Sequence, residues 1–224
     1  MMVAQAIQQD ESRPLDLISA GRPLEPVPPL ERRLFTVEDY HRMGEAGVLR
    51  PDERVELIDG EVVVMSPVNP PHINAVNAST SVFVRAVGDD AIVSIQNPIR
   101  LDNRSEPQPD LALWRPGVYR KAPAGPADTL LALEIADSSA ASDRTHKQRI
   151  YARAGVREFW LLTLNSSVDE TTGETQIDPI LEVYRRPRDM HYSEVRFLRR
   201  GEQIAPEALP EIMIAVEDLC GDYS

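Results

Sequence analysis

Residues 130–136 read Leu-Leu-Ala-Leu-Glu-Ile-Ala, an apolar run that a single carboxylate interrupts. The run has the length of a buried β-strand, and we expect it at the centre of a sheet. Side chains alternate between the two faces of a strand. One face carries Leu131, Leu133 and Ile135, and the other carries Leu130, Ala132, Glu134 and Ala136. Glu134 therefore projects over a face of mostly small residues that could hold an ion. The alternative is a carboxylate paired with an arginine, because a buried charge is costly without a partner.

A second carboxylate begins the neighbouring apolar run, residues 109–114, Pro-Asp-Leu-Ala-Leu-Trp. The connecting loop, residues 117–128, is rich in proline and glycine and short enough for the two runs to be adjacent strands. Ionised Asp110 and Glu134 would then repel each other, and a hard divalent cation with its preference for oxygen ligands would remove that penalty. Proline-aspartate is also a common turn dipeptide, which is the alternative for Asp110.

The chain has 22 arginines but only two lysines, Lys121 and Lys147. Lys147 falls on a helix that we expect Ser142 or Asp143 to cap, and that should run to about Ala154 and be closed by Gly155. The spacing puts four residues on one helix face, which should pack on the sheet: Lys147, Ile150, Tyr151 and Ala154. Lys147 then points inward, toward the end of the Glu134 strand. The alternative is a lysine at the edge of the core with its amine in solvent.

Two further residues are candidates for the same site. Glu56 lies in a predicted hairpin, residues 54–58 and 61–65, whose Asp59-Gly60 turn favours type I′ geometry. His72 lies in the first turn of a helix expected from Pro71 to Val87, where it could contact a phosphate or a water. The alternatives are an exposed strand face for Glu56 and an ordinary first-turn residue for His72.

The remaining pattern predicts an α/β fold, with a mixed β-sheet flanked by helices. Residues 1–33 carry five prolines and no lasting apolar periodicity, so we expect a disordered or loosely packed tail before a single domain at 34–224. Other expected elements are a helix at 36–44, strands at 91–96, 99–101, 158–164, 180–184 and 192–198, an exposed hairpin tip at 165–178, and one short strand and a turn within 206–218.

Composition limits the class of protein further. With 42% hydrophobic residues the chain has enough apolar side chains for a core, yet no run reaches the roughly 18 apolar residues of a membrane span. Cys220 is the only cysteine, which excludes an intramolecular disulfide, and we expect a cytoplasmic protein without a membrane partner. The net charge of −12 argues against non-specific nucleic-acid binding as the main role. No dinucleotide, P-loop or serine-hydrolase motif occurs.

In these residues the chain resembles the Uma family of restriction-endonuclease-like proteins, within the PD-(D/E)XK nuclease superfamily. The resemblance covers about residues 34–186, and its ordered motifs are residues 55–61 (VELIDGE), 70–72 (PPH), 109–112 (PDLA), 133–135 (LEI), 143–147 (Asp143, Arg144 and Lys147), Tyr151 and 154–161 (AGVREFWL). One departure stands at Asp137-Ser138-Ser139, where similar proteins carry a Ser-Pro-Ser turn.

The resemblance implies a restriction-endonuclease-like core that binds Mg²⁺ or Mn²⁺ through Asp110, Glu134 and the main-chain carbonyl of Ile135. It places the catalytic lysine on the next helix, at Lys147, and has Glu56 support a second ion or the water network. The implied activity is a metal-dependent DNA endonuclease, and a homodimer is one expected form.

Two alternatives to the endonuclease carry different expectations. A catalytically inactive module of the same fold, binding nucleic acid or a protein partner, suits the acidic net charge better. A carboxylate-pair glycosidase explains neither the lysine nor the lack of a sugar-stacking aromatic surface.

Overall fold

The computed structural model describes residues 31–65, 67–137, 141–168 and 175–221. It divides into two units, Met1–Arg33 and Leu34–Ser224, and the fold described below is that of the second unit. Of the predicted tail, residues 1–30 lie outside the described residues, as do Ser138 and Ser139 of the departing turn.

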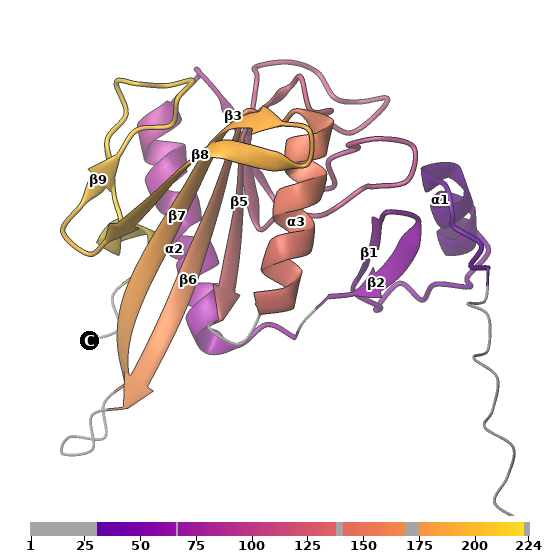
Figure 1. Cartoon of the computed structure of the whole chain (residues 1–224), viewed down its shortest axis with the longest axis horizontal. Coiled ribbons are helices and arrows are strands. Elements are labelled where there is room, and N and C mark those ends of the chain that lie inside the picture. The colour runs from indigo at the N-terminus through magenta and orange to yellow at the C-terminus, as the bar shows by residue number, and fades with distance from the viewer. Residues whose placement is uncertain (1–30, 66, 138–140, 169–174, 222–224) are drawn as a thin grey trace, which may run out of the picture. The chain divides into compact units, whose positions relative to one another are not determined.

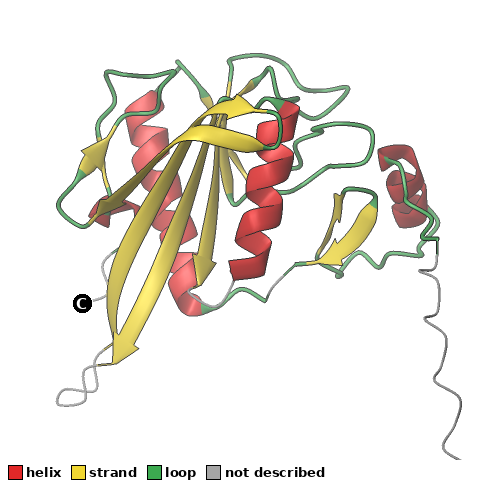
Figure 2. Ribbon diagram, in the orientation of Figure 1, coloured by secondary structure: helices red, strands yellow, loops and turns green. Residues whose placement is uncertain are grey.

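A six-stranded sheet forms the centre of the fold, in the order β3-β4-β5-β6-β7-β8 (Figure 1). The strands are β3 (Ile92–Ile95), β4 (Leu111–Trp114), β5 (Thr129–Asp137), β6 (Glu158–Val168), β7 (Thr175–Arg188) and β8 (His191–Arg199). β5 and β6 run parallel, and every other neighbouring pair is antiparallel. The predicted α/β fold with a mixed sheet flanked by helices is thus confirmed (Figure 2).

Two helices cover opposite faces of this sheet. α2 (Pro70–Val87) contributes Ala75, Val76, Phe83 and Val87 to one apolar cluster. α3 (Ala141–Ala154) contributes Ile150, Tyr151 and Ala152 to the other. α3 also joins β5 to β6, because two parallel strands need a crossover connection. It begins at Ala141, so the prediction that Ser142 or Asp143 caps it is wrong, whereas its end before Gly155, with φ at 80°, is as predicted.

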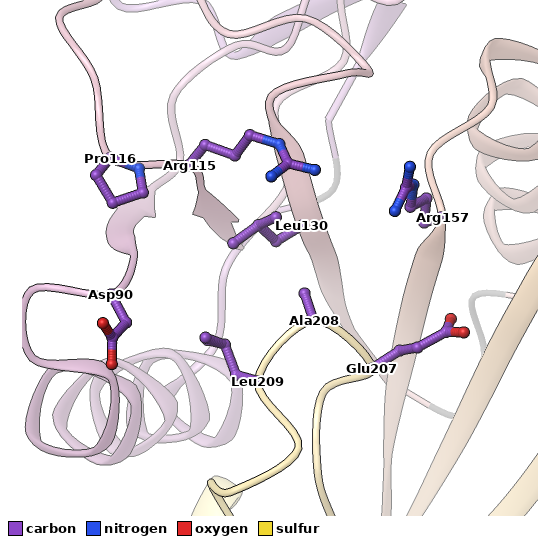
Figure 3. Close-up of a pocket in the computed structure, with 8 residues that line it drawn as sticks. All are labelled: Asp90, Arg115, Pro116, Leu130, Arg157, Glu207, Ala208 and Leu209. Atoms are coloured by element: carbon purple, nitrogen blue, oxygen red, sulfur yellow. The ribbon is translucent and has the colours of Figure 1, made fainter.

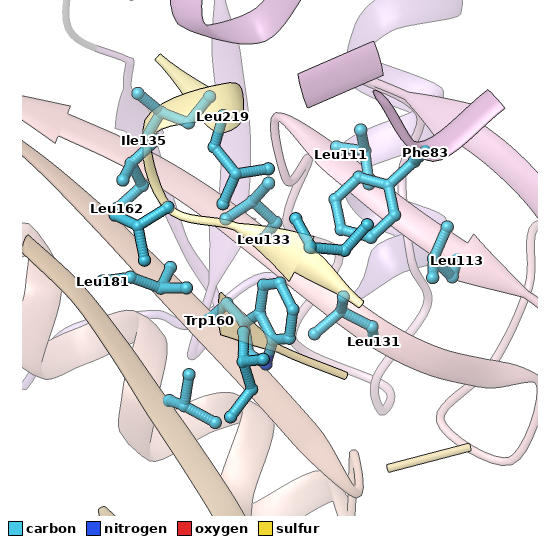
Figure 4. Packing of buried hydrophobic residues seen from close by; sticks show 14 of the residues in the cluster. Phe83, Leu111, Leu113, Leu131, Leu133, Ile135, Trp160, Leu162, Leu181 and Leu219 are labelled. Atoms are coloured by element: carbon cyan, nitrogen blue, oxygen red, sulfur yellow. The ribbon is translucent and has the colours of Figure 1, made fainter. Parts of the chain in front are cut away.

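The α2 face of the sheet carries the larger apolar core (Figure 4). Leu131, Leu133 and Ile135 of β5 all belong to it, as strand alternation predicts. Leu130 belongs to it too, and its predicted place on the Glu134 face is wrong. The reason is a shift of register in β4–β5, where Leu113 pairs with Leu131 but Trp114 pairs with Thr129. Such a bulge leaves one residue unpaired and re-aims its side chain.

The region before α2 contains a capped helix and a hairpin, both as predicted. α1 (Val37–Glu45) is capped by Thr36, whose side chain and that of Asp39 form a reciprocal capping box. β1 (Val55–Ile58) pairs with β2 (Glu61–Val64) through a turn with φ of 50° at Asp59 and 81° at Gly60. A Cβ at Gly60 would lie 2.7 Å from the Leu34 Cβ, so this turn needs glycine for space as well as for φ.

Two other predictions need correction. Residues 99–101 form no strand, because the Ile99 and Leu101 amides bond the carbonyls of Pro107 and Ser105 within one loop. Most of the predicted tip at 165–178 continues the β6–β7 ladder to the Val168–Thr175 pair, and residues 169–174 lie outside the described part. In the C-terminal region, β10 (Ile214–Ala215) and the 3₁₀ turn η1 (Glu217–Leu219) are the short strand and the turn that were predicted within 206–218, and β10 pairs with β9 (Gln203–Ile204), a strand that was not predicted.

Candidate active site

Asp110 lies just before β4, and its carboxylate is held from two sides. The Ile135 N–H, next to Glu134 on β5, donates to Oδ2 at 2.9 Å. His72 Nε2, from the first turn of α2, lies 3.0 Å from Oδ1, and Gln96 Nε2 reaches the same oxygen at 3.4 Å. Burial would raise the pKa of Asp110, but the hydrogen bonds and the charge of His72 outweigh it and lower the pKa below its usual range. Asp110 is therefore ionised at neutral pH.

Glu134 and Lys147 meet on the α3 face of the sheet. Lys147 Nζ donates to Glu134 Oε1 at 3.0 Å, and only 7% of the lysine side chain is exposed. The amine does not reach into solvent, and the partner of Glu134 is this lysine and not an arginine. Ile150 and Tyr151 are buried beside Lys147, which confirms the predicted inward helix face.

Glu56 joins the same amine from β1. Its Oε2 accepts from Lys147 Nζ at 3.0 Å and from the Gln108 main-chain N–H at 3.0 Å. The residue is 2% exposed, so an exposed strand face is not its environment. Segments 91 residues apart in the chain thus converge on one ammonium group.

The electrostatic balance of this cluster is uneven, because Glu56, Asp110 and Glu134 are grouped with one lysine. Burial raises the pKa of Glu134 to about 8, with the charges of Asp110 and Glu56 adding to the shift and that of Lys147 opposing it. Burial would lower the pKa of Lys147, but the charges of Glu134 and Glu56 raise it above its ordinary value. The lysine stays charged, and even with His72 beside Asp110 the three acids of the site outnumber its two basic side chains.

Three residues that the sequence did not single out as site residues also contact the cluster. The Tyr151 hydroxyl donates to Glu134 Oε1 at 3.0 Å, and burial with the charge of Glu134 raises the pKa of this tyrosine. Its place four residues after Lys147 could have indicated this contact. Gln108 donates its main-chain N–H to Glu56, and Gln96, whose φ is 50°, donates its side-chain amide to Asp110. No sequence pattern reveals either contact.

The donor set fits a hydrated magnesium ion. Among the described residues no group of three or more histidine, cysteine or acidic side chains forms a ready metal cage. Mg²⁺ does not require one, because it keeps several waters and takes one or two carboxylates together with substrate phosphates. Asp110 and Glu134 are hard oxygen donors in a site with excess negative charge. The hydrogen bond from the Ile135 N–H to Asp110 holds the Asp110 carboxylate against the main chain of the residue that follows Glu134.

A separate cavity lies on the α2 face, at the opposite ends of β4 and β5 (Figure 3). Its lining includes Arg115 and Arg157 but also Asp90 and Glu207, so its charges select no single class of ligand. None of the predicted site residues lines it. In the ranges that the structure covers, no helix combines the length and the apolar character needed to cross a bilayer.

The chain matches the model of a known protein family. The model of the family Uma2, described as "Putative restriction endonuclease", matches residues 37–217. No curated protein sequence matches the chain. The matched range includes every residue of the cluster described above.

Proposed function

We propose that this chain, which belongs to the Uma2 family, is a metal-dependent DNA endonuclease that hydrolyses phosphodiester bonds. One observation carries the proposal: Lys147 Nζ lies 3.0 Å from both Glu56 and Glu134, while Asp110 bonds the amide of the residue after Glu134. Acidic groups buried in excess over their cationic partner lower stability, and a divalent cation between them would remove that cost.

Each residue would have a distinct part in the chemistry. Asp110, Glu134 and the carbonyl of Ile135 would hold Mg²⁺ or Mn²⁺, which when bound polarises a phosphoryl oxygen and lowers the pKa of a bound water. Lys147 would orient the attacking water or stabilise the charge that develops on the phosphate. Glu56 would keep that amine in place, because it shares the ammonium with Glu134. His72 would orient Asp110 through their 3.0 Å contact, whereas the sequence predicted a phosphate or water contact.

The net charge of −12 supports a second candidate, an inactive module of the same fold that binds a protein partner or nucleic acid. The two candidates differ in what a bound metal would do. An endonuclease uses the metal for turnover. An inactive module would bind its partner as well after Asp110 and Glu134 are replaced by neutral residues as it does with both acids present.

A plasmid-nicking assay with a titration of Mg²⁺ and Mn²⁺ tests the proposal. We expect wild-type protein to convert supercoiled plasmid to the open circle only with metal. Asp110→Ala, Glu134→Ala and Lys147→Ala should each lower the rate by about 100-fold or more, the scale of loss seen when one electrostatic contributor is removed.

The second lysine provides a matched control. Lys121 is exposed in the loop between β4 and β5, so Lys121→Ala should nick as wild type does. Circular dichroism and thermal unfolding establish that each variant is folded. Equal cleavage by wild type and by folded Asp110, Glu134 and Lys147 variants, or no cleavage by wild type at any metal concentration, rejects the endonuclease.

A further inference from the structure

Tyr151 is a fully buried tyrosine whose hydroxyl points at the candidate site. The side chain is 0% exposed, and its hydroxyl donates to Glu134 Oε1 at 3.0 Å. Lys147 lies one helical turn earlier on α3, and its Nζ donates to the same oxygen at 3.0 Å. Two donors from one helix therefore fix a single oxygen of Glu134.

The other oxygen of Glu134 is left for a different partner. A carboxylate offers about four acceptor positions on its two oxygens. Oε2 accepts no hydrogen bond from any residue that the structure describes, although the Glu134 side chain is only 12% exposed. The arrangement turns one oxygen toward α3 and reserves the second, which is the pattern that a metal-binding carboxylate with supporting hydrogen bonds shows.

An aromatic stack keeps the Tyr151 ring in this position. The ring stacks on Phe159 of β6 with 5.1 Å between centroids, and Phe159 stacks on Tyr184 of β7 at 5.6 Å. Tyr192 lies 6.4 Å from Phe159 and donates its own hydroxyl to the Val156 carbonyl at 2.9 Å. Because these rings are buried and mutually packed, the Tyr151 hydroxyl cannot swing away from Glu134 without disturbing the sheet.

We infer that Tyr151 is a positioning residue for metal binding: it orients Glu134 so that Oε2 faces the ion, a role that rests on the proposed function. Lys147 alone could hold Glu134 Oε1, but its ammonium is shared with Glu56 and is needed for the phosphate during turnover. Tyr151 holds the carboxylate through a neutral donor that takes no part in the reaction. The lysine can then change partners while the metal ligand stays in place.

The test compares two buried tyrosines of one aromatic cluster. Tyr151→Phe keeps the stacked ring and removes only the hydroxyl that contacts Glu134. Tyr192→Phe removes a hydroxyl of similar burial that contacts only the Val156 carbonyl. Mn²⁺ binding to each full-length protein is measured by titration calorimetry, and nicking is measured against Mn²⁺ concentration.

We expect Tyr151→Phe to weaken Mn²⁺ binding by about five- to tenfold, the equivalent of one net hydrogen bond. The Mn²⁺ concentration for half-maximal nicking should rise by the same factor, and the rate at saturating Mn²⁺ should stay near that of wild type. Tyr192→Phe should change neither the Mn²⁺ affinity nor the Mn²⁺ concentration for half-maximal nicking, even if it lowers the melting temperature as much as Tyr151→Phe does. If Tyr151→Phe unfolds, 4-fluorophenylalanine at position 151 fills the volume of the hydroxyl without donating, and the same shift is expected.

Two outcomes overturn the inference, and they are distinguishable. Wild-type Mn²⁺ affinity in folded Tyr151→Phe, with nicking by wild type intact, removes the positioning role and leaves the endonuclease standing. Absence of both Mn²⁺ binding and nicking in wild type removes the endonuclease and the positioning role together.

Discussion

The buried Glu158 and the half-buried Glu134 differ in how the charge of a carboxylate inside the fold is balanced. Glu158 is 1% exposed, and both of its oxygens are bonded: Oε1 to Arg185 and the Trp160 indole at 2.7 Å each, and Oε2 to the Glu207 amide at 2.6 Å. One cation balances one anion there. Glu134 shares a single lysine with Glu56 and lies near Asp110. A balanced pair is typical of structure, and an unbalanced cluster is typical of a site that a ligand completes.

The difference has a free-energy consequence. Removing one partner of a balanced buried pair leaves an uncompensated charge, which costs several kcal/mol. Neutralising one acid of an over-acidic cluster relieves repulsion instead. Substitutions in the Glu158 cluster should therefore lower stability without changing activity. Substitutions in the Glu134 cluster should lower activity with little loss of stability.

The largest expected effect comes from Arg185→Met, which removes the cation that pairs with Glu158. We expect a loss of about 3–5 kcal/mol in the free energy of unfolding, measured by urea denaturation, because Glu158 stays buried. The nicking rate per folded molecule should not change. The matched change is Glu134→Gln, which keeps an acceptor for Lys147 and Tyr151. It should alter stability by less than about 1 kcal/mol at about pH 5, where folded Glu134 holds its proton, while abolishing nicking.

The assignment of a structural role to the Glu158 cluster and a functional role to the Glu134 cluster is rejected if Arg185→Met and Glu134→Gln give the opposite results. A large loss of stability in Glu134→Gln would make its cluster structural, and a loss of nicking in fully folded Arg185→Met would extend the site to the other face of the sheet.

The sequence predicted this site better than its surroundings. Asp110, Glu134 and Lys147 are visible because strand alternation and helical spacing determine where a side chain points. The contact between Lys147 and Glu56 depends on tertiary structure, since the β1 hairpin must lie against α3, and no local pattern specifies that. Gln108 acts through a main-chain amide, which side-chain chemistry cannot reveal.

The errors in the fold prediction have similar causes. Residues 165–178 look like a loop because they are polar, yet residues 165–168 pair with residues 175–178 in an antiparallel ladder. Pairing uses the main chain, so polar side chains do not prevent it. The bulge that moves Leu130 to the α2 face depends on the partner strand, and period-two alternation within residues 130–136 cannot show it.

The next expected effect is a dependence of stability on pH. The folded-state pKa of Glu134 is raised to about 8 from an ordinary value of 4.5, chiefly by burial, so the folded protein holds a proton that the unfolded chain has lost. Stability should therefore fall as pH rises through this window, by at most about 1.4 kcal/mol for each pH unit. The lowered pKa of Asp110 acts oppositely, and its contribution is lost only as the pH falls below its ordinary value of 3.8.

Urea denaturation between about pH 5 and pH 8 measures this decline. Burial raises the pKa of Glu158 as well, so wild type alone does not identify the residue responsible. Glu134→Gln should remove its part of the decline, and saturating Mn²⁺ should remove the same part in wild type. A decline that neither change reduces would assign the dependence to the Glu158 cluster.

The smallest expected effect tests whether main-chain donors hold the acidic cluster. The Gln108 amide bonds Glu56 Oε2 at 3.0 Å, while its side-chain Nε2 reaches only the Val55 carbonyl at 3.4 Å. Gln108→Ala keeps the main-chain N–H, so stability should change by less than about 0.5 kcal/mol and nicking should stay at the wild-type rate. Gln108→Pro removes the N–H and should lower both. If Gln108→Ala slows nicking as Gln108→Pro does, the Gln108 side chain and not its main-chain N–H positions Glu56. A main-chain donor would then hold the carboxylate of Glu158 but not that of Glu56.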